Sequence, residues 1–447
     1  MNRSFITLAI CFFTGLLSLT SCSNYRYQAS LYKKKPAFYS YIIGNINNDH
    51  IDLENYSDAY VTPASCQKTI TALLALKSLG HDYKYHTKLL VQKNERGFGD
   101  VVIKFSGDPT LTSEKLKELL LPIKMKKING NIILDASAFK TASLSDYISM
   151  YDLGKSFSTP VSAVNLDKNL IRITISPTKK LSLASIKQDG EAKIENFVIF
   201  NEEKTNITSS YKNGKFILRG NINIHDKNFE LKISPVDLEP YIIAKIRNIL
   251  KDLGINKKVF FVNDASKLPK NLHEYAEISS DNLADIIKPA NKISDNLTFD
   301  ALYLTMVHKA KPEGVDDWSD GYFTIKDLIK THLNIDLGGA VLVDGSGLSR
   351  YNRIQPRKLY EILKQGYSDR AFIESLAAPG EAKTTLDSRK NLPDSVRAKT
   401  GHLAMHNCLC GFDIKREKAF VFIASSYAPP VKEMNDVIDN FLRGYFK

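Results

Sequence analysis

Residues 63–68 read Pro63-Ala64-Ser65-Cys66-Gln67-Lys68 and lead directly into a mostly apolar run over residues 69–76. Apolar side chains at positions 70, 73, 74 and 76 recur at helical spacing, which predicts a helix over residues 65–79. Residues three apart on a helix differ by about 60° around its axis, so the hydroxyl of Ser65 and the amine of Lys68 share one face. This pair is a candidate nucleophile with its base.

An amine with the ordinary lysine pKa of about 10.4 stays protonated at neutral pH and cannot accept a proton. Partial burial and neighbouring cations can lower the pKa of Lys68 far enough for it to deprotonate a serine. The Ser-x-x-Lys pattern also begins at four other serines: Ser30, Ser137, Ser176 and Ser209. Only Ser65 opens a long apolar helix, where free backbone N–H groups favour a developing oxyanion.

Two further motifs carry side chains that the same chemistry uses. Ser-Asp-Asn occurs at residues 280–282 and again at 294–296, and helix N-capping explains either copy without catalysis. Lys399-Thr400-Gly401 occurs once and closes a strand signal over residues 396–399. On an edge strand, a lysine and a threonine can hold a substrate carboxylate, and the glycine lets the substrate backbone approach. An ordinary strand-end turn is the alternative interpretation.

Together, Ser-x-x-Lys, Ser-x-Asn and Lys-Thr-Gly form the motif set of penicillin-binding proteins and active-site serine β-lactamases. Residues 63–76 resemble the opening of the class C low-molecular-mass penicillin-binding proteins, the D-alanyl-D-alanine carboxypeptidase/endopeptidase family. Three other segments are similar to that family: 105–111 (FSGDPTL), 160–163 (PVSA) and 344–350 (DGSGLSR). The resemblance runs from about residue 37 to the C-terminus. Ser346 in the last segment is interpreted as part of a tight turn, not as a second nucleophile.

The resemblance implies an α/β (α+β) fold, namely a penicillin-binding/serine β-lactamase-like transpeptidase domain with β-rich insertion between the first and second motifs. The sequence between Lys68 and Ser294 is itself β-rich, and Asn213-Gly214 between two alternating runs predicts a hairpin. Simple β-lactamases have no such insertion there. We expect a catalytic domain over residues 22–84 and 270–447, and one or two inserted β-rich domains over 85–269.

The resemblance also implies roles for individual residues. Ser65 is the expected nucleophile on the carbonyl of the penultimate D-alanine, Lys68 the base, and Ser294 the group that passes a proton to the departing D-alanine. Asn296 would bind the substrate amide and orient the lysine. The copy at 294–296 is preferred to 280–282 because its surroundings, residues 291–302, are similar to the family's helix. Lys399 would supply positive potential.

The remaining expected binding residues surround the substrate's ends. Thr400 would bind the terminal carboxylate next to Gly401. His402 stands where the family commonly has threonine, so a second hydroxyl contact is lost, while its backbone N–H and that of Ser65 match the family's oxyanion hole.

Three residues are placed by resemblance at the substrate's side chain. Asp152 and Phe157 stand where some family members hold diaminopimelate, and Arg350 could join them as a carboxylate partner. Surface charges and a core phenylalanine are the alternative interpretation of these three residues.

The N-terminus is typical of a secretion signal. Arg3 precedes a mostly apolar stretch over residues 5–19, too short for a membrane span of about 20 residues. Leu19-Thr20-Ser21-Cys22 resembles a bacterial lipobox, which predicts a lipoprotein signal peptide over residues 1–21 and lipid on Cys22. A plain signal peptide is the alternative. Ser23 after the cysteine favours the outer membrane, so we expect a periplasmic protein anchored there.

Composition excludes several classes of protein. The 447 residues are 43% hydrophobic and 25% charged, as in a globular protein, which excludes a disordered chain. The net charge is +12, but the basic residues are scattered, so we expect no nucleic-acid partner. Cys66, Cys408 and Cys410 are an odd set, which argues against a disulfide framework. His406, Cys408 and Cys410 lack the further ligands of a metal site, so the cysteines are interpreted as buried apolar residues.

The resemblance therefore implies a D-alanyl-D-alanine carboxypeptidase and/or endopeptidase that acts on peptidoglycan stem peptides through a serine acyl-enzyme. It implies β-lactam antibiotics, penicillin among them, as inhibitors. The proposed chemistry needs no cofactor and no metal. Two alternatives stay open: a serine β-lactamase, and a catalytically idle peptidoglycan-binding lipoprotein that keeps the fold.

Overall fold

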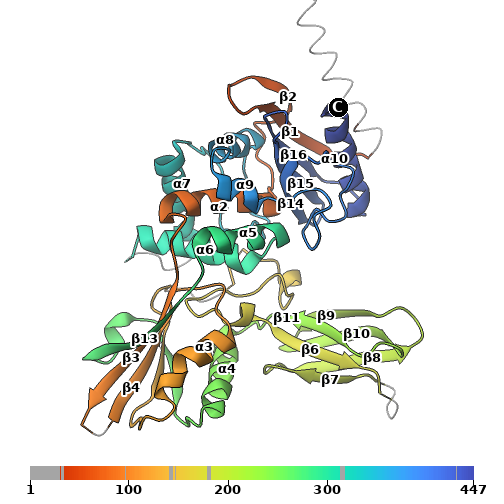
Figure 1. Cartoon of the computed structure of the whole chain (residues 1–447). Coiled ribbons are helices and arrows are strands. Elements are labelled where there is room, and N and C mark those ends of the chain that lie inside the picture. The colour runs from red at the N-terminus through yellow and green to blue at the C-terminus, as the bar shows by residue number, and fades with distance from the viewer. Residues whose placement is uncertain are drawn as a thin grey trace, which may run out of the picture.

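The computed structural model describes residues 31, 35–95, 97–139, 144–145, 147–178, 183–312, 318–428 and 430–446. The predicted signal peptide and Cys22 lie outside these residues. Figure 1 shows an upper body that holds the first described strands and the C-terminal helix, and a lower part built from the middle of the chain. In the described ranges, no helix combines the length and apolarity needed to cross a membrane.

The upper body is built on a five-stranded antiparallel sheet in the order β14-β15-β16-β1-β2. The strands are β1 (Phe38–Asn45), β2 (Ile51–Asn55), β14 (Val396–Leu403), β15 (His406–Asp413) and β16 (Lys418–Ser425). The first strand thus pairs with the last, which brings the two ends of the described chain together. β14, which carries the Lys-Thr-Gly triplet, lies at one edge of this sheet.

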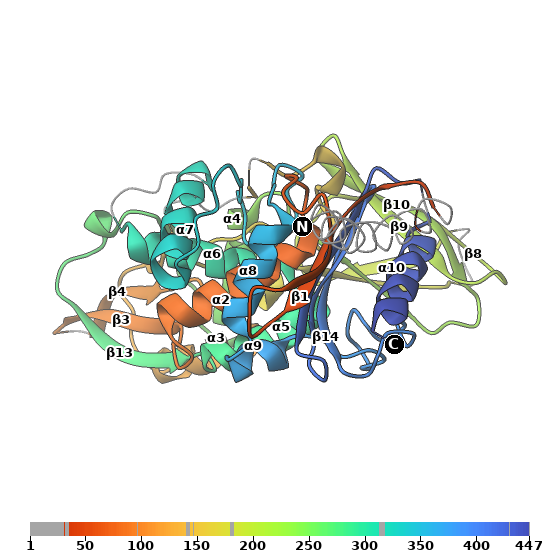
Figure 2. The same cartoon turned by 90° about the horizontal axis from the view of Figure 1, so that it is seen from above.

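Both faces of the upper sheet are covered (Figure 2). Because side chains alternate between faces, β1 sends Tyr39 and Tyr41 to the side of α10 (Val431–Tyr445) and Ile42 to the other side. The other side holds a helical layer: α2 (Gln67–Leu79), α5 (Leu283–Ile293), α6 (Asn296–Ala310), α7 (Trp318–Leu333), α8 (Pro356–Gly366) and α9 (Arg370–Ser375). Residues 67–76 of α2 are all buried, as expected for a helix at the centre of a core.

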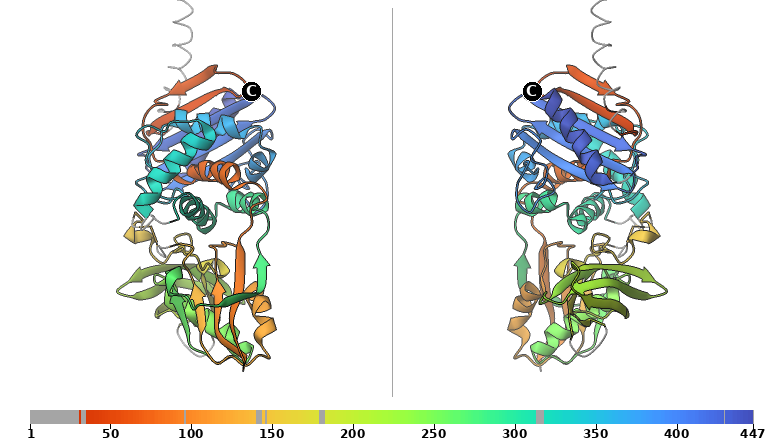
Figure 3. Two further views of the ribbon diagram at one scale, coloured as in Figure 1. Left: turned by 90° about the vertical axis from the view of Figure 1, so that its left-hand side faces the viewer. Right: turned by 90° about the vertical axis from the view of Figure 1, so that its right-hand side faces the viewer.

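The lower part contains a second five-stranded sheet in the order β12-β5-β4-β3-β13. Its strands are β3 (His86–Asn94), β4 (Gly97–Lys104), β5 (Ile132–Asp135), β12 (Val259–Val262) and β13 (Leu272–Ser279). Helices α3 (Ser113–Leu120) and α4 (Leu238–Asp252) accompany this sheet. The chain leaves the upper body through β3 and returns through its antiparallel partner β13 (Figure 3). The lower sheet therefore reaches beyond residue 269, where the predicted insertion ended.

Two three-stranded sheets complete the lower part, in the orders β8-β10-β9 and β11-β6-β7. Their strands are β6 (Ile171–Ser176), β7 (Ser185–Gln188), β8 (Ile194–Asn201), β9 (Asn206–Lys212), β10 (Lys215–Asn223) and β11 (Phe229–Ile233). The predicted hairpin is confirmed, because Lys212 pairs with Lys215 around Asn213 and Gly214, both of positive φ. Five 3₁₀ turns punctuate the described chain: η1 (Ala64–Cys66), η2 (Leu121–Ile123), η3 (Met150–Asp152), η4 (Asp167–Asn169) and η5 (Ala265–Lys267).

One buried ion pair ties α10 to the loop before β14, and it gives a stability prediction. Arg389 donates from Nε to both carboxylate oxygens of Asp439 at 3.0 Å, and both side chains are about 95% buried. In Asp439→Asn the guanidinium stays buried without its counter-charge, which costs roughly 3–5 kcal/mol of unfolding free energy. Urea denaturation followed by the fluorescence of Trp318, the single tryptophan, measures this loss.

The control is Glu374→Gln, which breaks two exposed pairs in the same body, one with Arg370 and one with Lys288. Exposed pairs contribute little, so this variant should unfold close to the parent midpoint. Equal losses in the two variants would contradict a special contribution from the buried pair.

Candidate active site

Ser65 lies in the turn η1, one turn before the α-helix rather than at its first residue as predicted. The turn is tight: Ala64 has φ +45°, a left-handed conformation that costs an alanine roughly 1–2 kcal/mol. Two glycine backbones pack closely against this turn. A Cβ on Gly347 would stand 2.0 Å from the carbonyl oxygen of Ala64, and one on Gly401 would stand 2.9 Å from the backbone N of Cys66. The packed backbones hold the strained turn in place.

Lys68 lies one turn along the helix with its amine turned to Ser65. Its Nζ is 2.9 Å from Ser65 Oγ, 2.6 Å from Asn296 Oδ1 and 2.6 Å from the backbone oxygen of Ser346. The last two atoms can only accept hydrogen bonds, so they take the two hydrogens of a neutral amine. The amine's lone pair is then left for the proton of the serine hydroxyl.

The surroundings of Lys68 favour this neutral form. The side chain is fully buried, and burial together with the nearby charge of Lys399 lowers the pKa of Lys68 to about 7. Asp300 and Asp344 act in the opposite direction and raise it. Burial has the larger effect, because an ammonium loses its hydration shell when it leaves water.

A buried loop over residues 344–349 supplies the third partner of the lysine. Asp300 Oδ1 accepts from the backbone N–H groups of Gly345 (3.0 Å) and Ser346 (2.8 Å), and Asp344 accepts from Gly347 and Ser349 at 2.7 Å each. These bonds aim the Ser346 carbonyl at Lys68. The sequence analysis interpreted Ser346 as part of a tight turn and not as a nucleophile. Its backbone carbonyl makes the contact with Lys68, which side-chain reasoning does not reveal.

Ser294 and Asn296 enter the site from the corner between α5 and α6. Ser294 ends α5 in a left-handed conformation (φ +62°), and Asn296 begins α6. Ser294 Oγ accepts from Lys399 Nζ at 2.9 Å, and Asn296 Nδ2 donates to the Phe157 carbonyl at 2.7 Å. The corner thereby joins both lysines, since Asn296 also binds Lys68.

The second Ser-Asp-Asn copy lies elsewhere. Ser280 Oγ accepts from the backbone N of Tyr85 (2.9 Å), and Asn282 bonds to Asp82 (3.3 Å) at the junction of β13 and α5. Neither residue lines the cavity beside Ser65. The Ser280 copy is structural.

Lys399 lies on the edge strand β14, and its amine reaches Ser294 in the site. Burial lowers the pKa of its amine to about 8. On the outer side of β14, Ala398 exchanges both backbone hydrogen bonds with Ala377. Because a strand alternates every two residues, the N–H groups of Thr400 and His402 face that same outer side, toward the cavity.

A cavity of about 530 Å³ opens beside Ser65. It is lined by most of the predicted site residues: Ser65, Ser294, Asn296, Thr400, His402, Asp152, Phe157 and Arg350. Arg350 Nη1 donates to Asp152 Oδ2 at 2.8 Å. Lys68 and Lys399 are buried behind this wall. A Cβ on Gly401 would meet η1 and Cys408, and Gly401 is not among the residues that line the cavity.

One lining residue was left without a role by the sequence analysis. Thr385 faces the cavity, and its hydroxyl is buried with no hydrogen-bond partner among the described residues.

Three cysteines of the described residues, Cys66, Cys408 and Cys410, lie beneath the site. Cys66 Sγ donates to the Lys399 carbonyl at 3.3 Å, and Cys408 Sγ to that of Pro63 at 2.6 Å. All three are free and buried, and His406 bonds to Ser425 instead of joining them. The arrangement is a packed seam between η1 and β15, as the apolar interpretation predicted.

Known proteins are similar to this chain over most of its length. The model of the D-Ala-D-Ala carboxypeptidase 3 (S13) family matches residues 29–445. The D-alanyl-D-alanine carboxypeptidase DacB of Haemophilus influenzae is 27% identical over 414 residues, which cover 87% of this chain and 85% of that protein. A D-alanyl-D-alanine carboxypeptidase of Actinomadura sp. (strain R39) is 24% identical over 407 residues, covering 82% of this chain and 74% of that one.

The crystal structure of penicillin binding protein 4 (dacB) from H. influenzae superposes with a TM-score of 0.79 at 25% identity, covering 94% of this chain and 98% of that one. The fold is therefore the predicted penicillin-binding, β-lactamase-like α/β fold with additional β-rich parts. Since the family model spans nearly the whole sequence, this chain belongs to the D-Ala-D-Ala carboxypeptidase 3 (S13) family.

Proposed function

We propose that this chain is a serine-type D-alanyl-D-alanine carboxypeptidase and/or endopeptidase that acts on peptidoglycan stem peptides and is inhibited by penicillin. The observation that carries the proposal is the buried Lys68 amine, 2.9 Å from Ser65 Oγ, with its other two bonds to acceptors. A base of pKa about 7 is matched to proton transfer at neutral pH.

In the acylation step, Ser65 Oγ attacks the carbonyl carbon of the penultimate D-alanine while its proton passes to Lys68. The N–H groups of Ser65 and His402 stabilise the oxyanion, an effect worth several kcal/mol in such sites. Collapse of the tetrahedral intermediate breaks the peptide bond. Ser294 relays a proton to the departing amine, so the proton that Lys68 took from Ser65 leaves with the D-alanine. Water then releases the acyl group from Ser65, whereas a penicillin-derived acyl group leaves slowly.

Binding depends on the two sides of the cavity. Thr400 binds the terminal carboxylate at the sheet edge, the buried Lys399 supplies positive potential there, and Asn296 binds the substrate amide. Asp152, with its partner Arg350, and Phe157 stand on the opposite wall, where they meet the side chain of the diaminopimelate residue. With His402 in place of threonine, the carboxylate has one hydroxyl contact fewer.

The location and the division of the chain are part of the same proposal. Residues 1–21 act as a lipoprotein signal, and lipid on Cys22 anchors the enzyme to the periplasmic face of the outer membrane. The catalytic domain comprises residues 22–84 and the segment from about 280 onward, because β13 pairs with β3 of the lower sheet. The remaining middle region forms the inserted domains.

Labelling with a fluorescent penicillin tests the proposal. The parent protein should form a stable covalent adduct, and Ser65→Ala should form none, because the acylated oxygen is absent. The matched control is Ser280→Ala, which keeps the site and should label like the parent. A protein that does not label would be an idle wall-binding lipoprotein, and rapid turnover of nitrocefin without a stable adduct would indicate a β-lactamase.

The pH dependence of acylation reports on Lys68. Below pH 7 its amine is increasingly protonated, so the labelling rate should fall about tenfold per pH unit toward pH 5 and level off above pH 7. Lys399→Gln removes a charge that lowers the pKa of Lys68. The midpoint should therefore move to higher pH, even as the overall rate falls.

Lys204→Gln, a change in the lower part, serves as the control and should leave the midpoint in place. If the midpoint of the pH–rate profile stays in place or moves to lower pH in Lys399→Gln, the fall in rate below pH 7 reports the titration of a group other than Lys68.

Gly401→Ala tests the close packing of β14 against the turn that carries Ser65. The new Cβ would stand 2.2 Å from Cys408 Sγ and 2.9 Å from both the Cys66 nitrogen and the Pro63 oxygen. The turn or β14 must move, and a displacement near 1 Å costs about 100-fold in rate. Stopped-flow labelling measures this loss. Gly444→Ala in α10, where a Cβ meets open space, is the control. A labelling rate near the parental value in Gly401→Ala would show that the position of Ser65 does not depend on this packing.

A further inference from the structure

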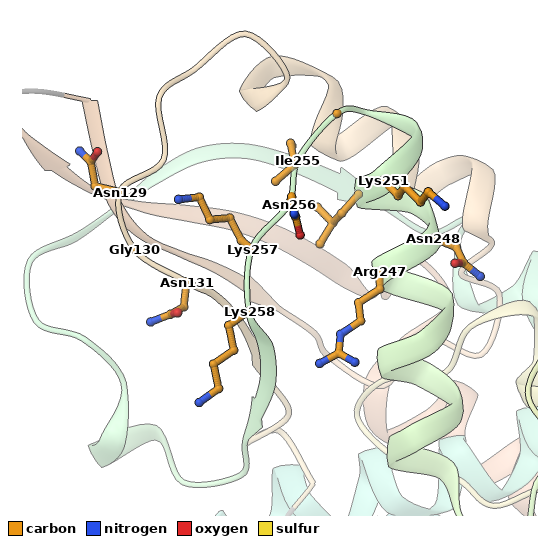
Figure 4. Close-up of a pocket in the computed structure, with 12 residues that line it drawn as sticks. Asn129, Gly130, Asn131, Arg247, Asn248, Lys251, Ile255, Asn256, Lys257 and Lys258 are labelled. Carbon is orange, nitrogen blue, oxygen red and sulfur yellow. The ribbon is translucent and has the colours of Figure 1, made fainter.

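A larger cavity lies in the lower part of the molecule, at the C-terminal end of α4. It has a volume of about 900 Å³ and shares no lining residue with the cavity beside Ser65. Figure 4 shows its walls: the last turns of α4, the segment 254–258 that leads into β12, and residues 129–131 before β5. The catalytic proposal makes no use of it.

Four cations line this cavity: Arg247, Lys251, Lys257 and Lys258. No ion pair to a carboxylate is found for any of them within the described part of the chain. Nearby cations are paired, such as Lys245 with Asp167 at 2.7 Å and Lys117 with Asp252 at 3.2 Å. Four unpaired like charges repel one another, so an anionic ligand would relieve the repulsion.

Two of the four have another local contact or role. The Lys258 amine lies 5.5 Å from the centroid of the Phe260 ring, a cation–π contact that leaves its charge unneutralised. Lys251 is in the last turn of α4, where a cation stabilises the negative end of the helix dipole. Arg247 lies a turn earlier and extends from the helix toward the segment that carries Lys258 (Figure 4). Lys257 and Lys258 lie on the opposite wall. The positive charges therefore point into the cavity from two elements, α4 and the segment before β12, and are not all explained by the dipole of one helix.

Amide groups accompany the cations. Asn131, Asn248 and Asn256 line the same space, and the backbone of Asn131 is fixed by its N–H bond to Asp100 Oδ1 at 2.7 Å. An amide both donates and accepts, which suits hydroxyl and acetamido groups, whereas a phosphate offers acceptors only. Cations with amides in a cavity of this size fit a carboxylate-bearing saccharide better than a small inorganic ion.

The cavity is the first of a row that runs toward the active site. A neighbouring cavity of about 720 Å³ shares Arg247 and Asn248 with it, and a third, of about 400 Å³, shares Asp189 and Lys245 with the second. The third is lined by Lys168, which donates to Asp295 at 2.6 Å, beside Asn296. A chain polymer lying along this row would reach the catalytic body.

We infer that the cavity at the end of α4 binds the glycan and stem-peptide carboxylates of a peptidoglycan strand. The choice of polymer rests on the proposed function, since the same strand would present its peptide to Ser65. A second attachment converts each later encounter into an intramolecular one and raises the effective substrate concentration. The site contributes to the capture of polymer and not to bond cleavage.

The test compares two triple variants of equal charge change in the otherwise unaltered chain. Arg247→Gln/Lys257→Gln/Lys258→Gln removes the converging cations, and Lys204→Gln/Lys212→Gln/Lys227→Gln removes three exposed lysines elsewhere in the lower part. Co-sedimentation with purified, protein-free sacculi measures binding over a range of NaCl concentrations. Hydrolysis of a soluble peptide ending in D-alanyl-D-alanine measures the catalytic site.

Binding of the cavity triple variant to sacculi should fall about tenfold, with a weaker salt dependence, while its kcat/KM on the soluble peptide stays within about twofold of the parent. The control triple variant should change neither value. Lys258→Glu alone should weaken binding more than Lys258→Gln, which confirms the sign of the charge with a milder change to the fold.

Equal loss of binding in both triple variants, or no loss in the cavity variant, would overturn the site. Unchanged binding to sacculi but lost binding to vesicles of anionic phospholipid would assign the cavity to lipid phosphates and overturn the saccharide assignment. Failure of the parent to hydrolyse the soluble peptide would refute the carboxypeptidase part of the proposed function. In that case, cavity-dependent binding to sacculi would still support this site.

Discussion

The buried amine of Lys68 makes three short contacts, and each requires a different part of the chain. The helix α2 sets its distance to Ser65, the α5–α6 corner brings Asn296, and the loop after residue 343 brings a backbone carbonyl. Two of the contacts are acceptors, so the amine keeps a lone pair only if it is uncharged. Burial makes that state accessible near neutral pH.

The rest of the upper body can be understood as the support of this geometry. The strained turn at Ala64 holds its shape because backbone atoms press on it from Gly347 and from Gly401 of the edge strand. The left-handed end of α5 places Ser294 beside Lys399. Two lysines thus lie close together in a dry interior, and each has a lowered pKa. Side chains with strongly shifted pKa values cluster in active sites, where protons are transferred during the reaction.

The sequence predicted the helices and strands with strong periodicity or turn chemistry, such as α10, the final strands and the hairpin at Asn213. It also identified the side chains that line the cavity, because their motifs are local. What it missed depends on tertiary contact: the pairing of β13 with β3, the carbonyl of Ser346, and the buried hydroxyl of Thr385. A backbone acceptor has no residue signature, and a strand partner far along the chain leaves no local pattern.

The paired strands β3 and β13 place the two junctions of the middle region side by side, one interstrand spacing of about 4.8 Å apart. Because the two junctions are adjacent, the upper body can fold around an inserted region of any length. The entropy lost in bringing the junctions together is small once β3 and β13 are paired.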